Sequence, residues 1–192
     1  MVRAGFGRPG PGRPAVQTDA RIDPKKIVVT GHSRYGKAAP YRFIHGKSER
    51  LRNIVGFAPY WFRPNFKKFV GKVDRLPIDQ HLSRALVAPR ALLATEGTQD
   101  SWTNPEGPQR TLLAARRVYE FLGARDRVSI RYRPVGHIPS NEDLLEFADH
   151  VVSGKPPSTS SASFPTRWRK PSSTGRFRNH RPEPGRVATV AV

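Results

Sequence analysis

Residues 27–37 read Ile-Val-Val-Thr-Gly-His-Ser-Arg-Tyr-Gly-Lys, a short apolar run that ends in a turn. The run follows Asp23-Pro24 and stops at Gly31, which is typical of a buried strand in a parallel sheet. Ser33 stands two residues after Gly31, so the chain must turn tightly as it leaves the strand. Such a turn lifts a serine hydroxyl above the sheet and directs the next backbone N–H at a developing oxyanion. The stretch therefore predicts a nucleophilic serine at a strand end.

The spacing of the glycines leaves a second interpretation open. In the usual nucleophile elbow of α/β-hydrolases, a glycine also stands two residues after the serine. Here Tyr35 holds that place, and Gly36 comes one residue later. An ordinary strand-to-helix turn in which Ser33 caps the next helix would contain the same residues.

Strands and helices alternate along the chain after this turn. Short apolar runs predict strands, and apolar residues that recur every three to four positions predict helices. The expected strands are 27–30, 91–95 and 127–133, and the expected helices are 79–87, 108–122 and 142–152. Asn141 is the expected N-cap of the last helix, and Gly154 ends it. This order predicts an α/β layered fold with a mostly parallel sheet.

The same periodicity predicts which side chains are buried, and the alternation in 127–133 predicts a strand near a sheet edge. The expected buried positions are Leu82, Leu86 and Val87 in the first helix, Leu112, Ala115, Tyr119 and Leu122 in the second, and Val128, Ile130 and Tyr132 in the last strand.

Two polar residues follow the next two strands. Asp100 follows strand 91–95, and His137 follows strand 127–133. Open parallel sheets build their sites at the carboxyl ends of strands, and α/β-hydrolases place serine, acid and histidine in this chain order. A neutral histidine can take the proton of a serine, and a carboxylate can orient that histidine. Each residue also has a simpler interpretation, Asp100 as a turn former and His137 as a solvated loop residue.

The other histidines point to no metal site, because no pair of them has the spacing of metal ligands. His32 is expected to pack inside the turn that carries Ser33, and His81 to make structural hydrogen bonds. The remaining three are expected at the surface: His45, His150 and His180.

The charge of the chain is concentrated at its two ends. The 192 residues include 34 Lys and Arg against 15 Asp and Glu, a net charge of +19. Residues 1–18 and 158–192 supply nearly half of this excess, and their Gly, Pro, Ser and Arg content predicts disordered basic tails. The globular domain is expected at 19–157. The closing run 187–192 could pair as an edge strand, but its surroundings predict a tail that the fold does not need.

The composition excludes several classes of protein. The chain has no cysteine, so it has no disulfide framework, thiolate zinc site or cysteine nucleophile. No apolar run approaches the roughly 20 residues that span a bilayer, so no membrane association is expected. No signal peptide is visible in residues 1–13.

At this point residues 31–37 can be matched to a known pattern: they resemble the G-x-S-R-x-G-K elbow of the glucuronoyl esterases, carbohydrate esterase family 15. The resemblance runs from about Thr18 to Pro157, and further matches follow in the family's order. They are the aromatic segment at 60–66, the P-x-D-Q-H and A-L-I-A-P-R block at 76–90, Asp100-Ser101-Trp102, and the histidine loop with its helix at 136–149. The resemblance implies the C-terminal part of an α/β-hydrolase three-layer sandwich.

The resemblance also implies an activity. Family members cleave esters between 4-O-methyl-glucuronic acid on xylan and lignin alcohols, with a serine triad and no cofactor. Carried over, it implies Ser33 as nucleophile, His137 as base and Asp100 as the triad acid. It further implies oxyanion stabilisation by Arg34 and substrate binding by Lys37, Trp102 and Glu49.

The chain departs from the family pattern in two places. Family members have a strand and an E-S-G-x-G-G loop between the elbow helix and the aromatic segment, but only 27 residues separate Ser33 from Tyr60. They also have a long N-terminal half without a counterpart here. We therefore expect part of a catalytic domain, with about three family strands and weak or no activity.

Two functional hypotheses of different class remain. The first is a monomeric serine carboxylic-ester hydrolase that acts on glucuronate esters of the glucuronoxylan type. The alternative is a non-catalytic basic protein that binds nucleic acid or another polyanion through its arginine-rich ends. Nucleic acid is the less favoured partner, because the bases of the core are interspersed with acids and no binding module is visible. A translated remnant that never folds is a third possibility. Family members are commonly secreted or periplasmic, and the sequence leaves the location of this chain open.

Overall fold

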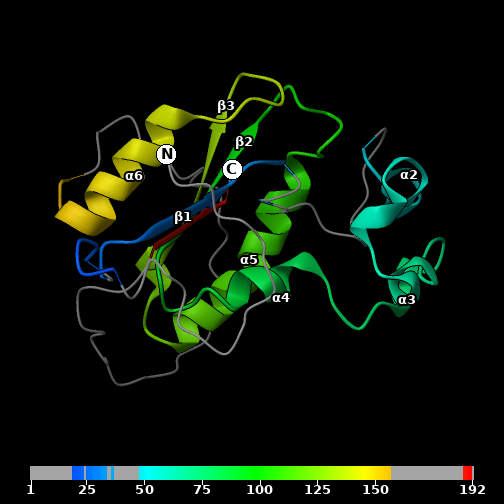
Figure 1. Ribbon diagram of the computed structural model, residues 1–192, viewed down its shortest axis with the longest axis horizontal. Coiled ribbons are helices and arrows are strands. Elements are labelled where there is room, and N and C mark those ends of the chain that lie inside the picture. The colour runs from blue at the N-terminus through cyan, green and yellow to red at the C-terminus, as the bar shows by residue number, and fades with distance from the viewer. Residues whose placement is uncertain (1–18, 24, 34–35, 37–47, 157–187, 192) are drawn as a thin grey trace, which may run out of the picture.

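The computed structural model describes residues 19–23, 25–33, 36, 48–156 and 188–191. Figure 1 labels their helices and strands except β4, which is drawn in red. The strands are β1 (Val28–Gly31), β2 (Leu92–Gly97), β3 (Val128–Arg133) and β4 (Ala188–Ala191). The helices are α2 (Leu51–Phe57), α3 (Pro64–Lys67), α4 (Gln80–Ala85), α5 (Glu106–Phe121) and α6 (Asn141–Ser153). Single 3-10 turns lie at Pro59–Trp61, Val73–Arg75 and Arg125–Arg127.

The four strands form one parallel sheet in the order β1-β4-β2-β3. All four strands run in one direction, so the carboxyl ends of β1, β2 and β3 lie along the same edge of the sheet, the one formed by the C-terminal ends of the strands. Ser33, Asp100 and His137 follow these three strand ends, so the topology brings them to that edge. The predicted α/β class with a parallel sheet is confirmed, and β3 is the edge strand that its alternation predicted.

Residues 188–191, inside the region 158–192 that was expected to be a tail, form the strand β4, and residues 158–187 lie outside the described residues. Residues 188–191 pair with β1 from Val28↔Ala188 to Gly31↔Ala191, and with β2 from Leu92↔Thr189 to Ala94↔Ala191. The strand therefore lies inside the sheet and not at its edge, and it separates β1 from β2. Without it, β1 would have no backbone partner among the described strands. The sheet has four strands where the sequence predicted about three.

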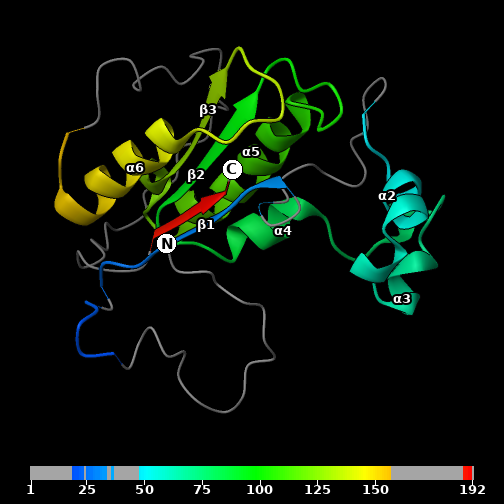
Figure 2. The same ribbon diagram turned by 45° about the horizontal axis from the view of Figure 1, so that its top comes forward.

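Helices cover both faces of this sheet (Figure 2). Alternate residues of a strand point to opposite faces, and β2 accordingly contributes to two apolar clusters. Leu92 and Ala94 pack with the α5 side chains Leu112 and Tyr119. Leu93 packs on the other face with Phe147 of α6. The arrangement is the helix–sheet–helix sandwich that the family resemblance implied.

The predicted buried face of α5 is confirmed, because Leu112, Ala115 and Tyr119 are all buried. Each apolar side chain buried in this way contributes roughly 1.5–3 kcal/mol. Leu122 lies just beyond the helix and is partly exposed, so the apolar stripe ends one turn earlier than the periodicity predicted.

The predicted buried face of α4 is wrong. Leu82 is 43% exposed and Leu86 is 79% exposed, whereas Gln80 and Arg84 are buried. The physical reason is that the polar partners of Arg84 lie on other elements. Arg84 donates a hydrogen bond to the carbonyl of Pro108 at 2.7 Å, and its Nη2 lies 3.9 Å from Oε1 of Glu96. A polar partner on a neighbouring element decided which side of this short helix faces inward.

α6 begins one residue before the predicted start. Ser140 is its N-cap, because the hydroxyl of Ser140 accepts a hydrogen bond from the backbone N–H of Asp143 at 3.2 Å. Asn141 is therefore the first helical residue and not the cap. Gly154 ends the helix with φ 70°, as predicted.

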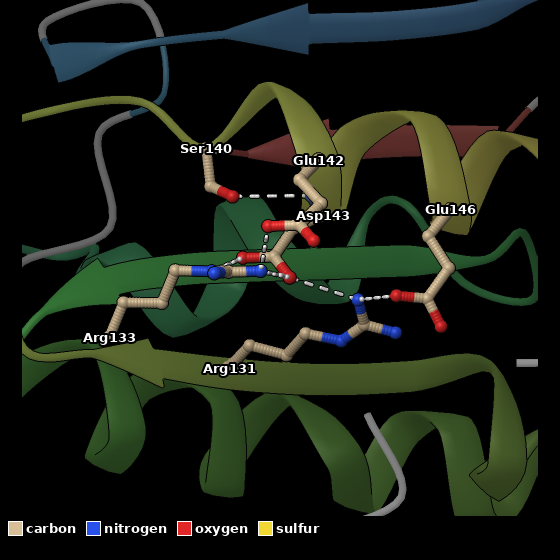
Figure 3. A network of polar contacts seen from close by, with 6 residues as sticks. All are labelled: Arg131, Arg133, Ser140, Glu142, Asp143 and Glu146. Atoms are coloured by element: carbon tan, nitrogen blue, oxygen red, sulfur yellow. Dashed lines mark hydrogen bonds and ion pairs between the residues drawn. The ribbon is translucent and has the colours of Figure 1, made fainter. Parts of the chain in front are cut away.

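A buried ion-pair network ties the start of α6 to β3 (Figure 3). The carboxylate of Asp143 is 3% exposed and accepts hydrogen bonds from Arg133 at 2.7 and 2.9 Å and from Arg131 at 3.0 Å. Arg131 also donates to Glu146 at 2.9 Å. The loop that carries His137 connects β3 to α6, so this network fixes both ends of that loop.

We expect Asp143→Asn to lower the free energy of unfolding by about 2 kcal/mol, because it weakens three charge-assisted hydrogen bonds from the partly exposed guanidinium groups of Arg131 and Arg133. Asp149→Asn, which removes an exposed partner of Lys155 on the same helix, is the matched control and should cost less than about 1 kcal/mol. Urea unfolding of both variants measures the difference. Equal losses in the free energy of unfolding for the two variants would mean that the Asp143 network stabilises the fold no more than an exposed ion pair does.

The pH dependence of this stabilisation has a definite sign. Burial raises the pKa of Asp143, but the hydrogen bonds from Arg133, Arg131 and Ser140 outweigh it and leave the pKa below its ordinary value of 3.8. The stabilisation is therefore complete above pH 3.8 and is lost as the pH falls through the lower pKa of the folded state. The difference between wild type and Asp143→Asn should shrink in this acidic range.

Candidate active site

The turn after β1 holds Ser33 in a conformation that few residues other than glycine adopt. Ser33 has φ 57°, and the backbone N–H of Gly36 donates to its carbonyl oxygen at 3.0 Å. A positive φ in a non-glycine residue is strained, and such strain is characteristic of residues held for function. The side chain is exposed at the sheet edge. The geometry is that of a tight elbow, which favours the first interpretation of this sequence over a simple helix cap.

The loops after β2 and β3 bring Asp100 and His137 into direct contact. Nδ1 of His137 lies 2.5 Å from Oδ2 of Asp100. A carboxylate can only accept a hydrogen bond, so Nδ1 carries the proton and Nε2 is left as the basic nitrogen. Asp100 is nearly buried, and its second oxygen accepts a hydrogen bond from the backbone N–H of Thr103 at 3.3 Å. The aspartate is thus held from one side while it orients the histidine on the other.

Gly97 explains why these two loops can approach so closely. A Cβ atom at Gly97 would lie 2.3 Å from the carbonyl oxygen of Gly136 and 2.4 Å from that of Val135. Thr98 and Gln99 also donate backbone hydrogen bonds to the carbonyls of Arg133 and Val135, at 2.8 and 3.0 Å. Only glycine fits at the end of β2, directly beside the residues that precede His137.

A cleft of about 300 Å³ opens at this edge of the sheet. Apolar walls and a few polar groups are the usual make-up of a small-molecule site. The cleft is lined by His32, Ser33, Gly36, Glu49, Phe57, Trp61, Thr95, Glu96, Gly97, Asp100, Trp102, Thr103, Pro108, Gly136, His137 and Ile138. Five of the seven site residues taken from the sequence therefore lie around one cleft. The other two, Arg34 and Lys37, lie outside the described residues.

One wall of the cleft comes from the segment that contains α2. Figures 1 and 2 place α2 and α3 to one side of the sheet. Two hydrogen bonds attach this segment to the β2 loop: the backbone N–H of Glu49 donates to the carbonyl of Trp102 at 2.7 Å, and Nε1 of Trp102 donates to the Glu49 carboxylate at 3.3 Å. The two proposed substrate-binding residues thus form a pair, with Phe57 and Trp61 beside them in the cleft wall.

Glu96 is a second carboxyl group at the cleft and was not singled out as a site residue by the sequence. Burial raises its pKa to about 7, although the charge of Arg84 acts in the opposite direction. Burial also lowers the pKa of Arg84 to about 10. A carboxyl group that is half protonated near neutral pH is a poor fixed anion. Asp100, in direct contact with the histidine, is better suited to orient His137.

His32 is the other cleft residue whose position the sequence left vague. Its ring centroid lies 4.7 Å from that of His137, with a tilt of 41° between the rings. His32 was expected to pack within the elbow, whereas its described ring partner comes from a different strand end. No local pattern in the sequence signals this pairing.

Comparisons with known proteins identify the ancestry of the chain. The family described as "Glucuronyl esterase, fungi" matches residues 38–123. The carbohydrate esterase MZ0003, from an unknown prokaryotic organism, is 32% identical over 178 residues, which are 72% of this chain and 41% of that protein. The chain is similar to glucuronoyl esterases over most of its own length.

Further glucuronoyl esterases show the same similarity. The 4-O-methyl-glucuronoyl methylesterase 1 of Wolfiporia cocos is 42% identical over 136 residues, 56% of this chain and 33% of that protein. The solved family 15 glucuronoyl esterase of Caldicellulosiruptor kristjansonii has a TM-score of 0.68 and 34% identity, and the match covers 82% of this chain and 52% of that one. The chain spans between a third and about half of the length of these relatives.

Two negative findings apply to the described part of the chain. Within the described ranges, no three His, Cys, Asp or Glu side chains gather as metal ligands would. No helix among the described elements is both long enough and apolar enough to cross a bilayer.

Proposed function

We propose that this chain hydrolyses esters of glucuronic acid, with Ser33 as nucleophile, His137 as general base and Asp100 as the residue that orients the base. The observation that carries the proposal is the Asp100–His137 hydrogen bond at 2.5 Å, in a cleft that also contains the strained Ser33. The relatives named 4-O-methyl-glucuronoyl methylesterase supply the substrate class.

In the first half of the reaction, Oγ of Ser33 attacks the ester carbonyl carbon and gives its proton to Nε2 of His137. Nδ1 is occupied by Asp100, and the carboxylate stabilises the imidazolium that forms. The backbone N–H after the serine and the guanidinium of Arg34, which lies outside the described residues, would stabilise the negative charge on the former carbonyl oxygen. When the intermediate collapses, the leaving alcohol takes the proton from His137, and the uronic acyl group stays on Ser33.

In the second half, a water molecule replaces the alcohol. It gives a proton to His137 as its oxygen attacks the acyl carbon, and the same groups stabilise the second oxyanion. Collapse returns the proton to Oγ of Ser33 and releases the free uronic acid. No redox step or cofactor is needed, since the reaction consists of acyl transfer and proton transfer alone.

The substrate is proposed to sit with its sugar against Trp102 and Glu49. An indole face suits a pyranose ring, and the Glu49 carboxylate can accept hydrogen bonds from sugar hydroxyls while Trp102 holds it in place. Lys37 would contact the uronate hydroxyls. Phe57 and Trp61, with ring centroids 5.4 Å apart, present an apolar wall that suits an aromatic alcohol.

The test is a substrate comparison on the full chain. We expect the benzyl ester of glucuronic acid to be cleaved at least about tenfold faster than the benzyl ester of an aliphatic acid of similar size, a difference of about 1.4 kcal/mol in barrier. The reason is that only the uronate offers hydroxyls to Glu49 and a ring to Trp102. Equal rates on the two esters would rule out a uronate site.

The same assay should give a low absolute rate. β1, which carries Ser33, is the edge strand of the described sheet, so its outer side lacks a described neighbour that could fix the elbow. Displacement of a catalytic group by about 1 Å costs on the order of a hundredfold in rate. We expect kcat/KM to lie more than about tenfold below that of a relative twice as long, assayed in parallel. A value within about tenfold would show that the described scaffold suffices.

A monomer is the proposed active form. The polyanion-binding alternative gains little support from the described core, because Arg131 and Arg133 are both engaged by acidic side chains.

A further inference from the structure

His32 is the ring in the cleft to which the proposed mechanism gives no task. It precedes the nucleophile directly and lines the same cleft. Its ring centroid is 4.7 Å from that of His137, with the two planes tilted by 41°. The Nδ1 atom of His32 is buried, and no described residue forms a hydrogen bond with it. The ring is therefore placed by its packing and not by a polar partner within the described residues.

His137 needs a second constraint. Its side chain is 47% exposed, and its described hydrogen bond runs from Nδ1 to Asp100. A single hydrogen bond fixes one corner of an imidazole but lets the ring tilt about that corner. A second ring packed beside it opposes this tilt, and His32 is the described ring in that place.

The charges around His32 favour its neutral form. Burial lowers the pKa of His32 from its ordinary value of 6.5, the charge of His137 lowers it further, and Asp100 opposes both. Glu96 and Glu49 are the other described ionisable groups that line the cleft. These effects favour the neutral form of the His32 ring. A neutral aromatic ring attracts an adjacent cation, whereas a second imidazolium would repel it.

We propose that His32 is a positioning residue: its ring packs against that of His137 and keeps the base in the orientation that the hydrogen bond to Asp100 selects. This inference rests on the proposed function for its kinetic consequence. Its structural content, an ordered His137–Asp100 hydrogen bond that depends on His32, does not depend on any catalytic activity.

Two variants of the full chain distinguish the effect of an aromatic ring at position 32 from the effect of an apolar side chain of similar size. His32→Phe keeps a flat ring and cannot take up a proton, whereas His32→Leu keeps an apolar group without a ring face. His150→Ala, at the exposed end of α6, is the control for loss of a histidine elsewhere. Circular dichroism of each variant establishes that it is folded.

The first readout is the proton NMR resonance of His137 Nδ1–H, which a short hydrogen bond to a carboxylate moves far downfield. We expect wild type, His32→Phe and His150→Ala to keep this resonance near neutral pH, and His32→Leu to lose or broaden it. An unchanged resonance in His32→Leu, or its loss in a folded His32→Phe, would overturn the inference. This readout decides the matter even if the wild type cleaves no ester, a result that would count against the proposed function alone.

The second readout is the pH profile of glucuronate ester hydrolysis. His32→Leu should lower kcat by at least about tenfold with little change in KM, since the base is misplaced while the sugar contacts remain. His32→Phe should retain kcat at neutral pH. Below pH 6.5 the wild-type profile should show a second bend where His32 takes up its proton, and the His32→Phe profile should show one bend. Identical profiles would contradict a neutral stacking partner.

Discussion

Replacing Ser33 by alanine is expected to remove the ester-cleaving activity of the chain down to the uncatalysed rate, by about a thousandfold where the wild-type rate allows the range to be measured. The hydroxyl is the atom that forms the acyl bond, and no water can take its place at the strained elbow with the same geometry. The fold should not change, because the Ser33 side chain is exposed. The measurement is hydrolysis of benzyl glucuronate by the two purified proteins.

Ser83→Ala is the matched control for this substitution. Ser83 is exposed on α4, away from the residues that line the cleft, so its loss should leave the rate unchanged. Retention of the wild-type rate in Ser33→Ala would show that a different group attacks the ester and would remove the assigned nucleophile.

Replacing Thr189 by proline is expected to have the largest effect on stability. Every residue of an interior strand directs its backbone N–H to one neighbour or the other, and proline has no N–H to donate. Thr189 is paired with Val29 of β1 and Leu92 of β2. We expect a loss of about 3 kcal/mol or more in the free energy of unfolding, since proline in the middle of a regular element costs at least this much.

The effect of Thr189→Pro should be greatest at β1, because β4 is the only described strand that pairs with it. Hydrogen exchange of the β1 amides should therefore accelerate more than that of the β3 amides. Thr189→Val keeps the N–H and a β-branched side chain and serves as the control. Unchanged protection of β1 in Thr189→Pro would mean that residues 188–191 do not hold this strand. It would also restore the sequence-based expectation that the region after residue 157 is dispensable.

Local patterns were sufficient to predict most of the sheet and its helices. The short apolar runs that became β1 and β2, the alternation in β3 and the stripe Leu112–Ala115–Tyr119 in α5 each contain their signal within a few neighbouring residues. β4 could not be predicted in the same way. Its four residues lie in a region rich in Pro, Ser and Arg, and its partners are far away in the sequence. Its place in the sheet depends on backbone pairing with both β1 and β2, which a local sequence pattern does not show.

The residues of the site also fall into those that local sequence patterns predict and those that they do not. Ser33, Asp100 and His137 could be selected because each follows a strand and their chain order matches a known catalytic order. The contacts of His32 with His137 and of Arg84 with Glu96 join different elements, so no spacing in the sequence reveals them. For the same reason the inward face of α4 was predicted wrongly: the apolar period favoured Leu82 and Leu86, whereas the Pro108 carbonyl and the Glu96 carboxyl group on other elements hold Arg84 inside.

The most direct test of a histidine-activated serine in this chain is covalent labelling. The full chain would be treated with a fluorophosphonate, which phosphonylates serines activated by a neighbouring histidine, and the modified residue located by mass spectrometry. We expect one adduct, on Ser33, that disappears in Ser33→Ala and forms much more slowly in His137→Ala. No adduct in a folded wild type, or an adduct on another serine that persists in Ser33→Ala, would contradict the assignment of Ser33, His137 and Asp100 as a catalytic unit.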